Sequence, residues 1–302
     1  MRIFVTGASG FIGSAVAAEL IDAGHDVIGL ARSDQAASAV QAAGAEVHRG
    51  ALDDLESLRS GAGAADGVVH TAYIHDFSRM QDSARTDLLA IETLGAALEG
   101  SGRPMVITTG TALIKPGEVA TEEDSADSDS HPRLKAEHAA KAFAARGVRT
   151  SVVRPGASVH GEGDHGFVPV LIDIARTKGV SAYIGDGSNR WPAVHRLDAA
   201  NLYRLALEDA TAGSVFHAIA DQGIATRDIA DVIGRHLELP VVSIAQQDAA
   251  EHFGWMGMFF GIDAPASSAL TQKRLGWRPA RPGLLEDLEQ GHYFAQTRAA
   301  AA

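Results

Sequence analysis

Near its start the chain reads Thr6-Gly7-Ala8-Ser9-Gly10-Phe11-Ile12-Gly13, directly after the apolar segment Arg2–Val5. The glycines of this turn have separate physical uses: Gly7 permits a tight turn, Gly10 lets the backbone approach a diphosphate, and Gly13 lets a following helix pack closely on the sheet. The N-terminus of that helix then faces the phosphates. The stretch therefore predicts a strand, a dinucleotide-binding turn and a helix, rather than a glycine-rich loop without a ligand.

Beyond the turn, short apolar runs alternate with longer helical patterns. This alternation is typical of repeated βα units, so we predict an α/β fold with a doubly wound parallel sheet, as in Rossmann domains, and helices on both of its faces. The expected strands are Arg2–Val5, Asp26–Ala31, Ala45–His48, Gly67–His70, Pro104–Thr108 and Arg149–Arg154, and the expected helices are Phe11–Ala23, Asp34–Ala43, Ser78–Ser101 and Leu134–Arg146.

The regularity weakens after Arg154, and the sequence predicts a smaller C-terminal lobe that lies over the cofactor. We place a dinucleotide-binding domain at residues 1–156 and a substrate lobe at 157–302, with a segment at about 193–220 returning to the main domain. Asp198 is well placed to cap the helix that follows it. Helices are expected at Asp198–Leu207, Ile229–Leu237 and Ser267–Leu275, loops at Gly161–Pro169 and Gly185–Val194, and a solvated polar connection at Thr121–Ser130.

The composition is that of an ordinary globular chain: 302 residues, 46% of them apolar, a formal charge of −12 and no cysteine. Without cysteine, disulfides, thiolate catalysis and zinc–thiolate sites are excluded, and the spacing of the histidines gives no reason to expect a metal site. The negative charge argues against a nucleic-acid partner. We find neither a membrane-length apolar run nor room for a signal peptide, and expect a cytoplasmic protein with a small-molecule substrate. The sequence leaves a homo-oligomer open.

The glycine turn resembles that of the extended and atypical short-chain dehydrogenase/reductase families, which include nucleotide-sugar epimerases, dehydratases and dihydroflavonol-type reductases. Three later stretches support the resemblance, namely Val153–Gly161, Tyr183–Asp198 and Leu275–Pro279. The resemblance covers nearly the whole chain. It implies a nicotinamide cofactor on a Rossmann sheet and a substrate pocket between that sheet and the C-terminal lobe.

The end of the second expected strand indicates which nicotinamide cofactor is bound. A carboxylate there would accept hydrogen bonds from the ribose and repel a 2′-phosphate, but this chain has Ala31. Arg32 and Ser33 follow, and a guanidinium with a hydroxyl suits a 2′-phosphate. NADP(H) is therefore favoured over NAD(H). The alternative is that Arg32 is a solvent-exposed side chain paired with Asp34.

The resemblance also implies which other residues contact the cofactor. The aspartate that contacts adenine after the third strand is missing, so either Asp53 replaces it or the contact is lost. Small residues after the fourth strand pass beside the phosphates and ribose, and the segment after the sixth strand approaches the carboxamide. The expected cofactor-binding residues are Gly7, Gly10, Phe11, Ile12, Gly13, Arg32, Ser33, Leu52, Asp53, Thr71, Ala72, Lys135, Pro155 and Ala157.

The catalytic residues of the resembled families are a Ser or Thr after the fifth strand and a Tyr-x-x-x-Lys run on the next helix. In this chain Gly110 occupies the hydroxyl position, with Thr109 and Thr111 on either side. Lys135 is retained, but His131 stands where the tyrosine belongs. The proton donor is therefore open between His131, Tyr73, water and another histidine.

The substrate is expected to meet Tyr73, His165, Phe167 and Trp191, which lie in loop segments around the implied cofactor site. The apolar run Phe253–Phe260 covers the mouth of the pocket, lies between subunits or packs in the core. We therefore expect an NADP(H)-dependent oxidoreductase that reduces a small carbonyl compound or oxidises the matching alcohol. The alternatives are a nucleotide-sugar epimerase or dehydratase and a non-catalytic NADP-binding sensor.

Overall fold

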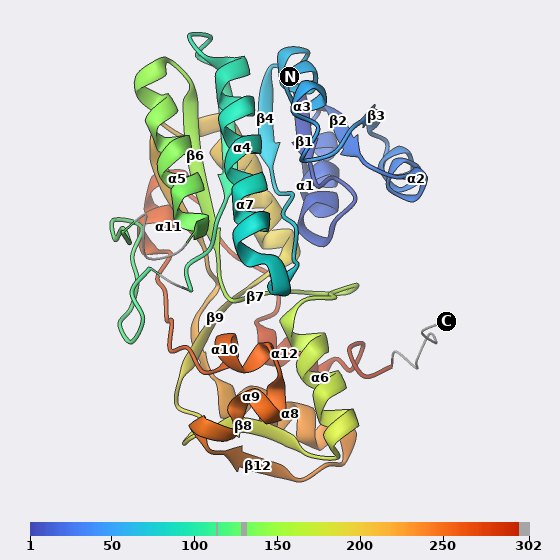
Figure 1. The fold of residues 1–302 in the computed structure, drawn as a ribbon, viewed down its shortest axis with the longest axis vertical. Helices are drawn as coiled ribbons and strands as arrows, with labels where there is room; N and C mark the ends of the chain where they lie inside the picture. Colours follow the sequence, from blue (N-terminus) through green and yellow to red (C-terminus); the bar gives the residue numbers. More distant parts are fainter. Residues whose placement is uncertain (113, 128–131, 296–302) are drawn as a thin grey trace.

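The computed structural model describes residues 1–112, 114–127 and 132–295. Its centre is a parallel sheet of seven strands in the order β10-β6-β5-β4-β1-β2-β3 (Figure 1). The strands are β1 (Arg2–Thr6), β2 (Asp26–Ala31), β3 (Glu46–Arg49), β4 (Gly67–His70), β5 (Pro104–Thr108), β6 (Arg149–Pro155) and β10 (Ser214–Ala218).

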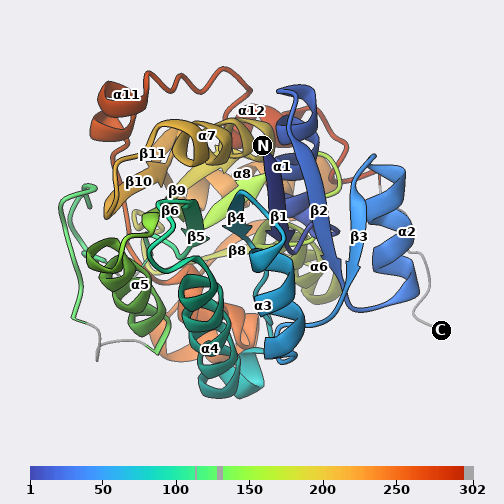
Figure 2. The ribbon, with the colours of Figure 1, turned by 90° about the horizontal axis from the view of Figure 1, so that it is seen from above.

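Helices cover both faces of this sheet, so its strands other than the edge strand β3 are almost fully buried. Seen from above, α1 and α7 lie on one side of the sheet, and α3, α4 and α5 lie on the other (Figure 2). Each side has its own buried apolar cluster. The helices are α1 (Phe11–Asp22), α2 (Asp34–Ala42), α3 (Leu55–Gly63), α4 (Met80–Leu98), α5 (Pro132–Ala142) and α7 (Arg196–Asp209).

The order of the strands determines where a ligand can bind. The chain winds outward from β1 through β2 and β3, and then in the other direction through β4, β5 and β6. In such a sheet the carboxyl ends of the strands on either side of the reversal leave a crevice. The predicted doubly wound Rossmann fold is confirmed, and its crevice lies at the ends of β1 and β4.

Most of the remaining elements lie beyond the carboxyl ends of these strands (Figure 1). Helix α11 (Ala269–Leu275) instead packs beside β10 and α7. Two small sheets, β11-β9-β7 and β12-β8, and a third apolar cluster support the elements beyond the strand ends. The division into two domains is not tested here and stays a prediction. The elements are β7 (Ser158–His160), β8 (Ser181–Ile184), β9 (Arg190–His195), β11 (Asp221–Ala225), β12 (Val241–Ile244), α6 (Phe167–Lys178), α8 (Thr226–Leu237), α9 (Ala249–Phe253), α10 (Met256–Phe260), α11 (Ala269–Leu275) and α12 (Leu284–Glu289).

Three segments differ from the sequence prediction. The predicted loop Gly185–Val194 contains most of strand β9, whose apolar residues pair with β7 and β11. The predicted loop Gly161–Pro169 ends in the first turn of α6. In the supposedly solvated run Thr121–Ser130, the Glu122 carboxylate is buried and accepts hydrogen bonds at 2.6 Å from the Thr271 amide and hydroxyl, so this segment anchors α11.

Candidate active site

The glycine turn joins β1 to α1 at the crevice. Gly7 has a φ of +73°, and a Cβ there would lie 2.8 Å from the Ala72 nitrogen. A Cβ on Gly13 would lie 2.0 Å from the carbonyl oxygen of Gly7. Gly10 differs, because its Cβ would meet only the Gly7 oxygen, at 3.2 Å. Packing thus excludes side chains at Gly7 and Gly13, whereas Gly10 is exposed and leaves its backbone open to a ligand.

Helix α1 presents its N-terminus at this opening. It is 12 residues long, its N-cap Gly10 makes no side-chain capping bond, and its first turn has no acidic residue. The first N–H groups of a helix have no partner within the helix, and they attract anions. The backbone at Phe11 and Ile12 therefore fits the diphosphate of a dinucleotide.

The end of β2 carries the residues from which the sequence predicts binding of a 2′-phosphate. Ala31 is buried and Arg32 is exposed. The structure does not pair Arg32 with Asp34, because Asp34 accepts a hydrogen bond from Arg49 Nη2 at 2.6 Å. Within the described residues no hydrogen bond or ion pair engages the Arg32 guanidinium. The Ser33 hydroxyl accepts from the Ala36 amide at 3.2 Å and caps α2, which leaves its proton available to an anion.

The expected adenine and carboxamide contacts lie on opposite sides of the crevice. Leu52 is half-buried against the core and Asp53 beside it is exposed, after β3. Pro155 ends β6, and Ala157 packs against the third apolar cluster. Nothing in the structure tests these contacts directly, so they stay predictions.

Thr71 and Ala72 follow β4 and pack against the glycine turn. The Thr71 hydroxyl donates to the Thr6 carbonyl oxygen at 2.8 Å. The same hydroxyl oxygen would lie 2.7 Å from a Cβ on Gly13. The small residues predicted beside the phosphates therefore form one side of the turn itself.

Tyr73 comes next and is half-buried. The Arg133 guanidinium carbon lies 4.0 Å from the centre of its ring, and the His75 ring lies edge-on at 5.2 Å. Burial raises the pKa of Tyr73, although the charge of Arg133 opposes this effect in part. The phenol therefore keeps its proton at neutral and mildly alkaline pH, and the phenolate form is disfavoured. Desolvation lowers the pKa of His75, and the charges of Arg133 and His165 lower it further.

The structure describes only some of the predicted catalytic residues. Lys135 is exposed on α5, whereas His131 lies outside the described residues. The Thr109 hydroxyl donates to Glu137 Oε2 at 2.9 Å, and the Thr111 hydroxyl donates to the Pro155 carbonyl oxygen at 3.3 Å. Both hydroxyls are therefore engaged in the core. A catalytic role for either one stays a prediction that requires the backbone to shift.

A buried ion pair that the sequence analysis missed fixes the helix that carries Lys135. Glu137 and Arg154 are each 1% exposed, and Arg154 Nε donates to Glu137 Oε2 at 2.9 Å. Burial alone would raise the pKa of Glu137, but hydrogen bonding and charge from Arg154 outweigh it and hold the pKa below its ordinary value. An arginine inside an apolar strand was the available signal, since such a charge requires a buried partner.

His165 lies on the far side of the crevice, over the glycine turn. Its ring is edge-on to Phe11 with 5.8 Å between ring centres, and the Arg196 guanidinium carbon lies 4.9 Å from the centre of the Phe11 ring. Arg196 also donates to the Glu162 carbonyl oxygen at 3.1 Å. The loop that carries His165 thus closes over the first turn of α1.

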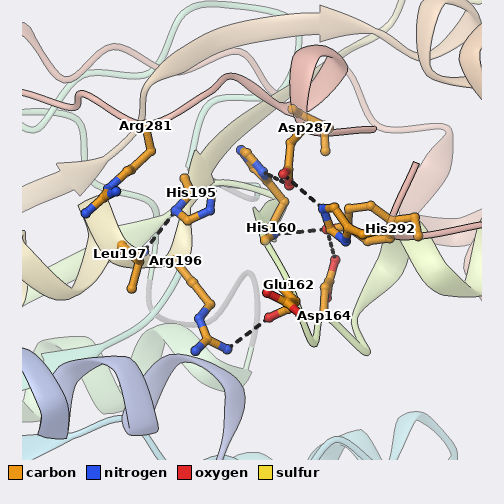
Figure 3. A network of polar contacts seen from close by, with 12 residues as sticks. His160, Glu162, Asp164, His195, Arg196, Leu197, Arg281, Asp287 and His292 are labelled. Atoms are coloured by element: carbon orange, nitrogen blue, oxygen red, sulfur yellow. Dashed lines mark hydrogen bonds and ion pairs between the residues drawn. The ribbon is translucent and has the colours of Figure 1, made fainter. Parts of the chain in front are cut away.

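Residues near the C-terminus hold this loop in place (Figure 3). Tyr293 donates to Asp164 Oδ2 at 2.9 Å and accepts from the Gly161 amide at 3.0 Å. Asp287 bridges His160, at 2.8 Å, and His292, at 3.0 Å. Sequence reasoning missed this anchoring, because the partners are more than 100 residues apart.

The predicted cap of α7 is wrong. His195, not Asp198, caps the helix, since its Nδ1 accepts from the Leu197 amide at 3.2 Å (Figure 3). Asp198 instead accepts from the Ala280 and Arg281 amides at 2.9 to 3.1 Å. The carboxylate therefore ties the C-terminal segment to α7.

Phe167 lies in an aromatic cluster. Its ring centre is 5.7 Å from that of Trp191, 5.9 Å from that of Trp255 and 5.3 Å from that of Phe259. Trp191 is 1% exposed and donates to the Phe259 carbonyl oxygen, so it supports Phe167 from within the core. Trp255 is 39% exposed. A substrate could reach Phe167 and Trp255, while direct contact with Trp191 stays an untested prediction.

Comparison with known proteins identifies the family. The model of the NAD dependent epimerase/dehydratase family matches residues 3–219. The chain belongs to this family. It is an NAD(P)-dependent enzyme, and the resemblance to extended short-chain dehydrogenases/reductases is confirmed.

Relatives of this family member differ in how much is known of them. The chain is 49% identical to the uncharacterized protein C2A9.02 of Schizosaccharomyces pombe, over 97% of this chain and 100% of that protein. It is 29% identical to the 4-hydroxy-2-methyl-3-oxo-4-farnesyl-3,4-dihydroquinoline-1-oxide ketoreductase of Stigmatella aurantiaca, over 88% and 84% of the two chains. The dTDP-glucose 4,6-dehydratase DesIV of Streptomyces venezuelae, solved with NAD and TYD bound, superimposes with a TM-score of 0.79 at 19% identity over 97% of each chain. The last similarity shows the fold.

The described residues contain neither a membrane-spanning helix nor a cluster of metal ligands. Across the part of the chain that the structure describes, no helix is long and apolar enough to cross a membrane. Among the same residues, no group of three or more His, Asp or Glu side chains could hold a metal ion.

Proposed function

We propose that this family member is an NADP(H)-dependent oxidoreductase that reduces a small carbonyl compound with an apolar part, or oxidises the matching alcohol. The observation that carries the proposal is the place of the half-buried Tyr73, directly after the Thr71 and Ala72 residues that pack on the dinucleotide turn. Burial raises the pKa of this phenol and so disfavours the phenolate, the form that would act as a base. Carbonyl reduction needs a proton donor, whereas an epimerase or dehydratase needs a base to remove a sugar hydroxyl proton. A ketoreductase among the relatives also supports reduction.

The residues would divide the chemistry as follows. A bound NADPH supplies the hydride. Tyr73 donates the proton to the substrate oxygen, and Lys135 holds the nicotinamide ribose. His165 closes the pocket over Phe11, and the exposed Trp255 with Phe167 forms its apolar wall. His131 remains the alternative proton donor.

The experiment that tests the proposal follows the absorbance of NADPH, with NADH in parallel, while a panel of aldehydes and ketones is added to the purified protein. Turnover with NADPH supports the reductase. Tight binding of NADPH without turnover of any carbonyl would favour the sensor, and purification with retained NAD would favour the epimerase or dehydratase.

Arg32→Ala is expected to weaken NADPH binding about tenfold, since a charge-assisted contact to the 2′-phosphate is lost. NADH lacks that phosphate, and its affinity should be unchanged. Both dissociation constants are measured by fluorescence titration of the cofactor. Arg59→Ala is the matched control, because Arg59 is an exposed arginine of α3 that pairs with Glu56. Equal losses for NADPH and NADH would contradict the assignment of Arg32.

A further inference from the structure

Three buried polar side chains lie beneath the glycine turn and have no part in the proposed chemistry. Thr6 and His70 are 0% exposed, and Asp87, on α4, is 1% exposed. Thr6 Oγ1 lies 2.8 Å from His70 Nδ1, and His70 Nε2 lies 3.0 Å from Asp87 Oδ1. The three side chains therefore form a chain of hydrogen bonds from α4 to the start of the turn.

The hydrogen atoms of this hydrogen-bond network can be assigned by matching each donor to an acceptor. The Ala72 amide donates to Thr6 Oγ1 at 3.4 Å. The Thr6 hydroxyl proton needs an acceptor of its own, and among the described residues His70 Nδ1 is the hydrogen-bond partner that can accept it. His70 Nδ1 must then carry no proton, so Nε2 carries it and donates to Asp87. Only the neutral Nε2–H tautomer of His70 makes all three contacts and also gives the Thr6 hydroxyl proton an acceptor among the described residues.

Asp87 enforces that tautomer, because an ionised carboxylate can only accept hydrogen bonds. Its second oxygen, Oδ2, is buried without a hydrogen-bond partner among the described residues. His70 is thus the hydrogen-bond donor that this carboxylate finds in the described part of the chain. If the proton moved to Nδ1, His70 would donate to the Thr6 hydroxyl, whose own proton would then have no acceptor among the described residues. The Thr6 side chain would have to turn to satisfy that buried proton, and the Ala72 amide would lose its partner.

The position of Ala72 matters because it touches the turn directly. A Cβ on Gly7 would lie 2.8 Å from the Ala72 nitrogen and 2.9 Å from its Cα atom. Tyr73 follows at once along the chain. A displaced Ala72 amide would therefore change both the surface that receives the dinucleotide and the position of the candidate proton donor.

We propose that Asp87 is a positioning residue for cofactor binding: it fixes His70 as the Nε2–H tautomer, so that Thr6 holds the Ala72 amide against the glycine turn. The proposal rests on dinucleotide binding by the family and not on the direction or substrate of the reaction.

Asp87→Asn tests the tautomer. The amide NH2 should face His70 Nε2, since in the other orientation both amide hydrogens would be buried where Oδ2 has no partner. In this variant we expect His70 to change from the Nε2–H to the Nδ1–H form, which the ¹⁵N imidazole spectrum reports. The signals of His70 are identified as those that His70→Gln lacks. NADPH should bind about tenfold more weakly, as expected for one lost buried hydrogen bond.

Two matched substitutions of Thr6 test the same hydrogen-bond network without altering Asp87. Thr6→Val keeps the shape and removes the hydroxyl, whereas Thr6→Ser keeps the hydroxyl. NADPH should bind about tenfold more weakly to Thr6→Val than to Thr6→Ser. Glu208→Gln is the control, because its carboxylate contacts His25, at 2.8 Å, and the turn is not involved.

Binding is titrated without a carbonyl substrate, so failure of the reductase proposal leaves this test intact. Wild-type His70 in the Nδ1–H or doubly protonated form would overturn the inference. So would equal NADPH affinities for Thr6→Val and Thr6→Ser, or an Asp87→Asn variant that changes tautomer and binds NADPH as the wild type does.

Discussion

Tyr73→Phe is expected to lower kcat for carbonyl reduction about 1,000-fold, within the usual range for loss of a general acid. The NADPH dissociation constant should change little, because the ring that stacks on Arg133 is retained and only the hydroxyl is removed. Steady-state kinetics with a carbonyl substrate and a separate cofactor titration measure the two quantities.

The pH profile shows which residue donates the proton. With Tyr73 as the acid, its raised pKa keeps the proton in place, so wild-type reduction should be constant through neutral pH and decline only at alkaline pH. If His131 were the acid, activity should fall as pH rises past about 6.5, the ordinary histidine pKa. A Tyr73→Phe variant that keeps most of its kcat, with a decline near neutral pH, would transfer the role to His131.

Gly10→Ala is expected to weaken NADPH binding on the order of 100-fold and to leave the fold intact. Gly10 has φ −84° and ψ 174°, which alanine adopts, and the new Cβ meets only the Gly7 oxygen, at 3.2 Å. That methyl group would project from the exposed backbone into the space that the diphosphate requires. Thermal unfolding and cofactor titration are the measurements.

Gly13→Ala should behave differently, because its Cβ would lie 2.0 Å from the Gly7 oxygen. The overlap requires the turn to move and should cost about 3 kcal/mol of stability or more. Gly63→Ala is the common control, since a Cβ on Gly63 meets nothing within 4 Å. Unchanged NADPH affinity in Gly10→Ala would mean that the diphosphate does not approach this turn.

The sequence predicted the fold correctly where the local residue pattern determines the structure. The glycine spacing and the buried apolar runs predicted the Rossmann sheet, and strands such as β2 and β5 begin and end where expected. Strand β9 was missed because its flanking Gly, Ser and Asn residues are typical of a loop, and only pairing with β7 and β11 stabilises it.

The candidate site was harder to predict from the sequence, because its side chains are positioned by partners that are distant in the sequence. No local pattern shows that the Thr109 hydroxyl donates a hydrogen bond to Glu137, or that Tyr293 holds the loop bearing His165. His70 and Asp87 were also missed, since a histidine that ends an apolar strand does not by itself indicate a partner on the next helix. Tertiary hydrogen bonds of this kind are visible only in the structure.

The most direct measurement of the central claim is the destination of the cofactor hydride. The protein is incubated with NADPH deuterated at the transferred position and with a carbonyl compound that it consumes, and the product is examined by mass spectrometry and NMR. We predict an alcohol carrying one deuterium on the former carbonyl carbon and an equal amount of NADP⁺. Consumption of substrate with the deuterium still on the cofactor, or with the hydride returned to a sugar, would contradict it.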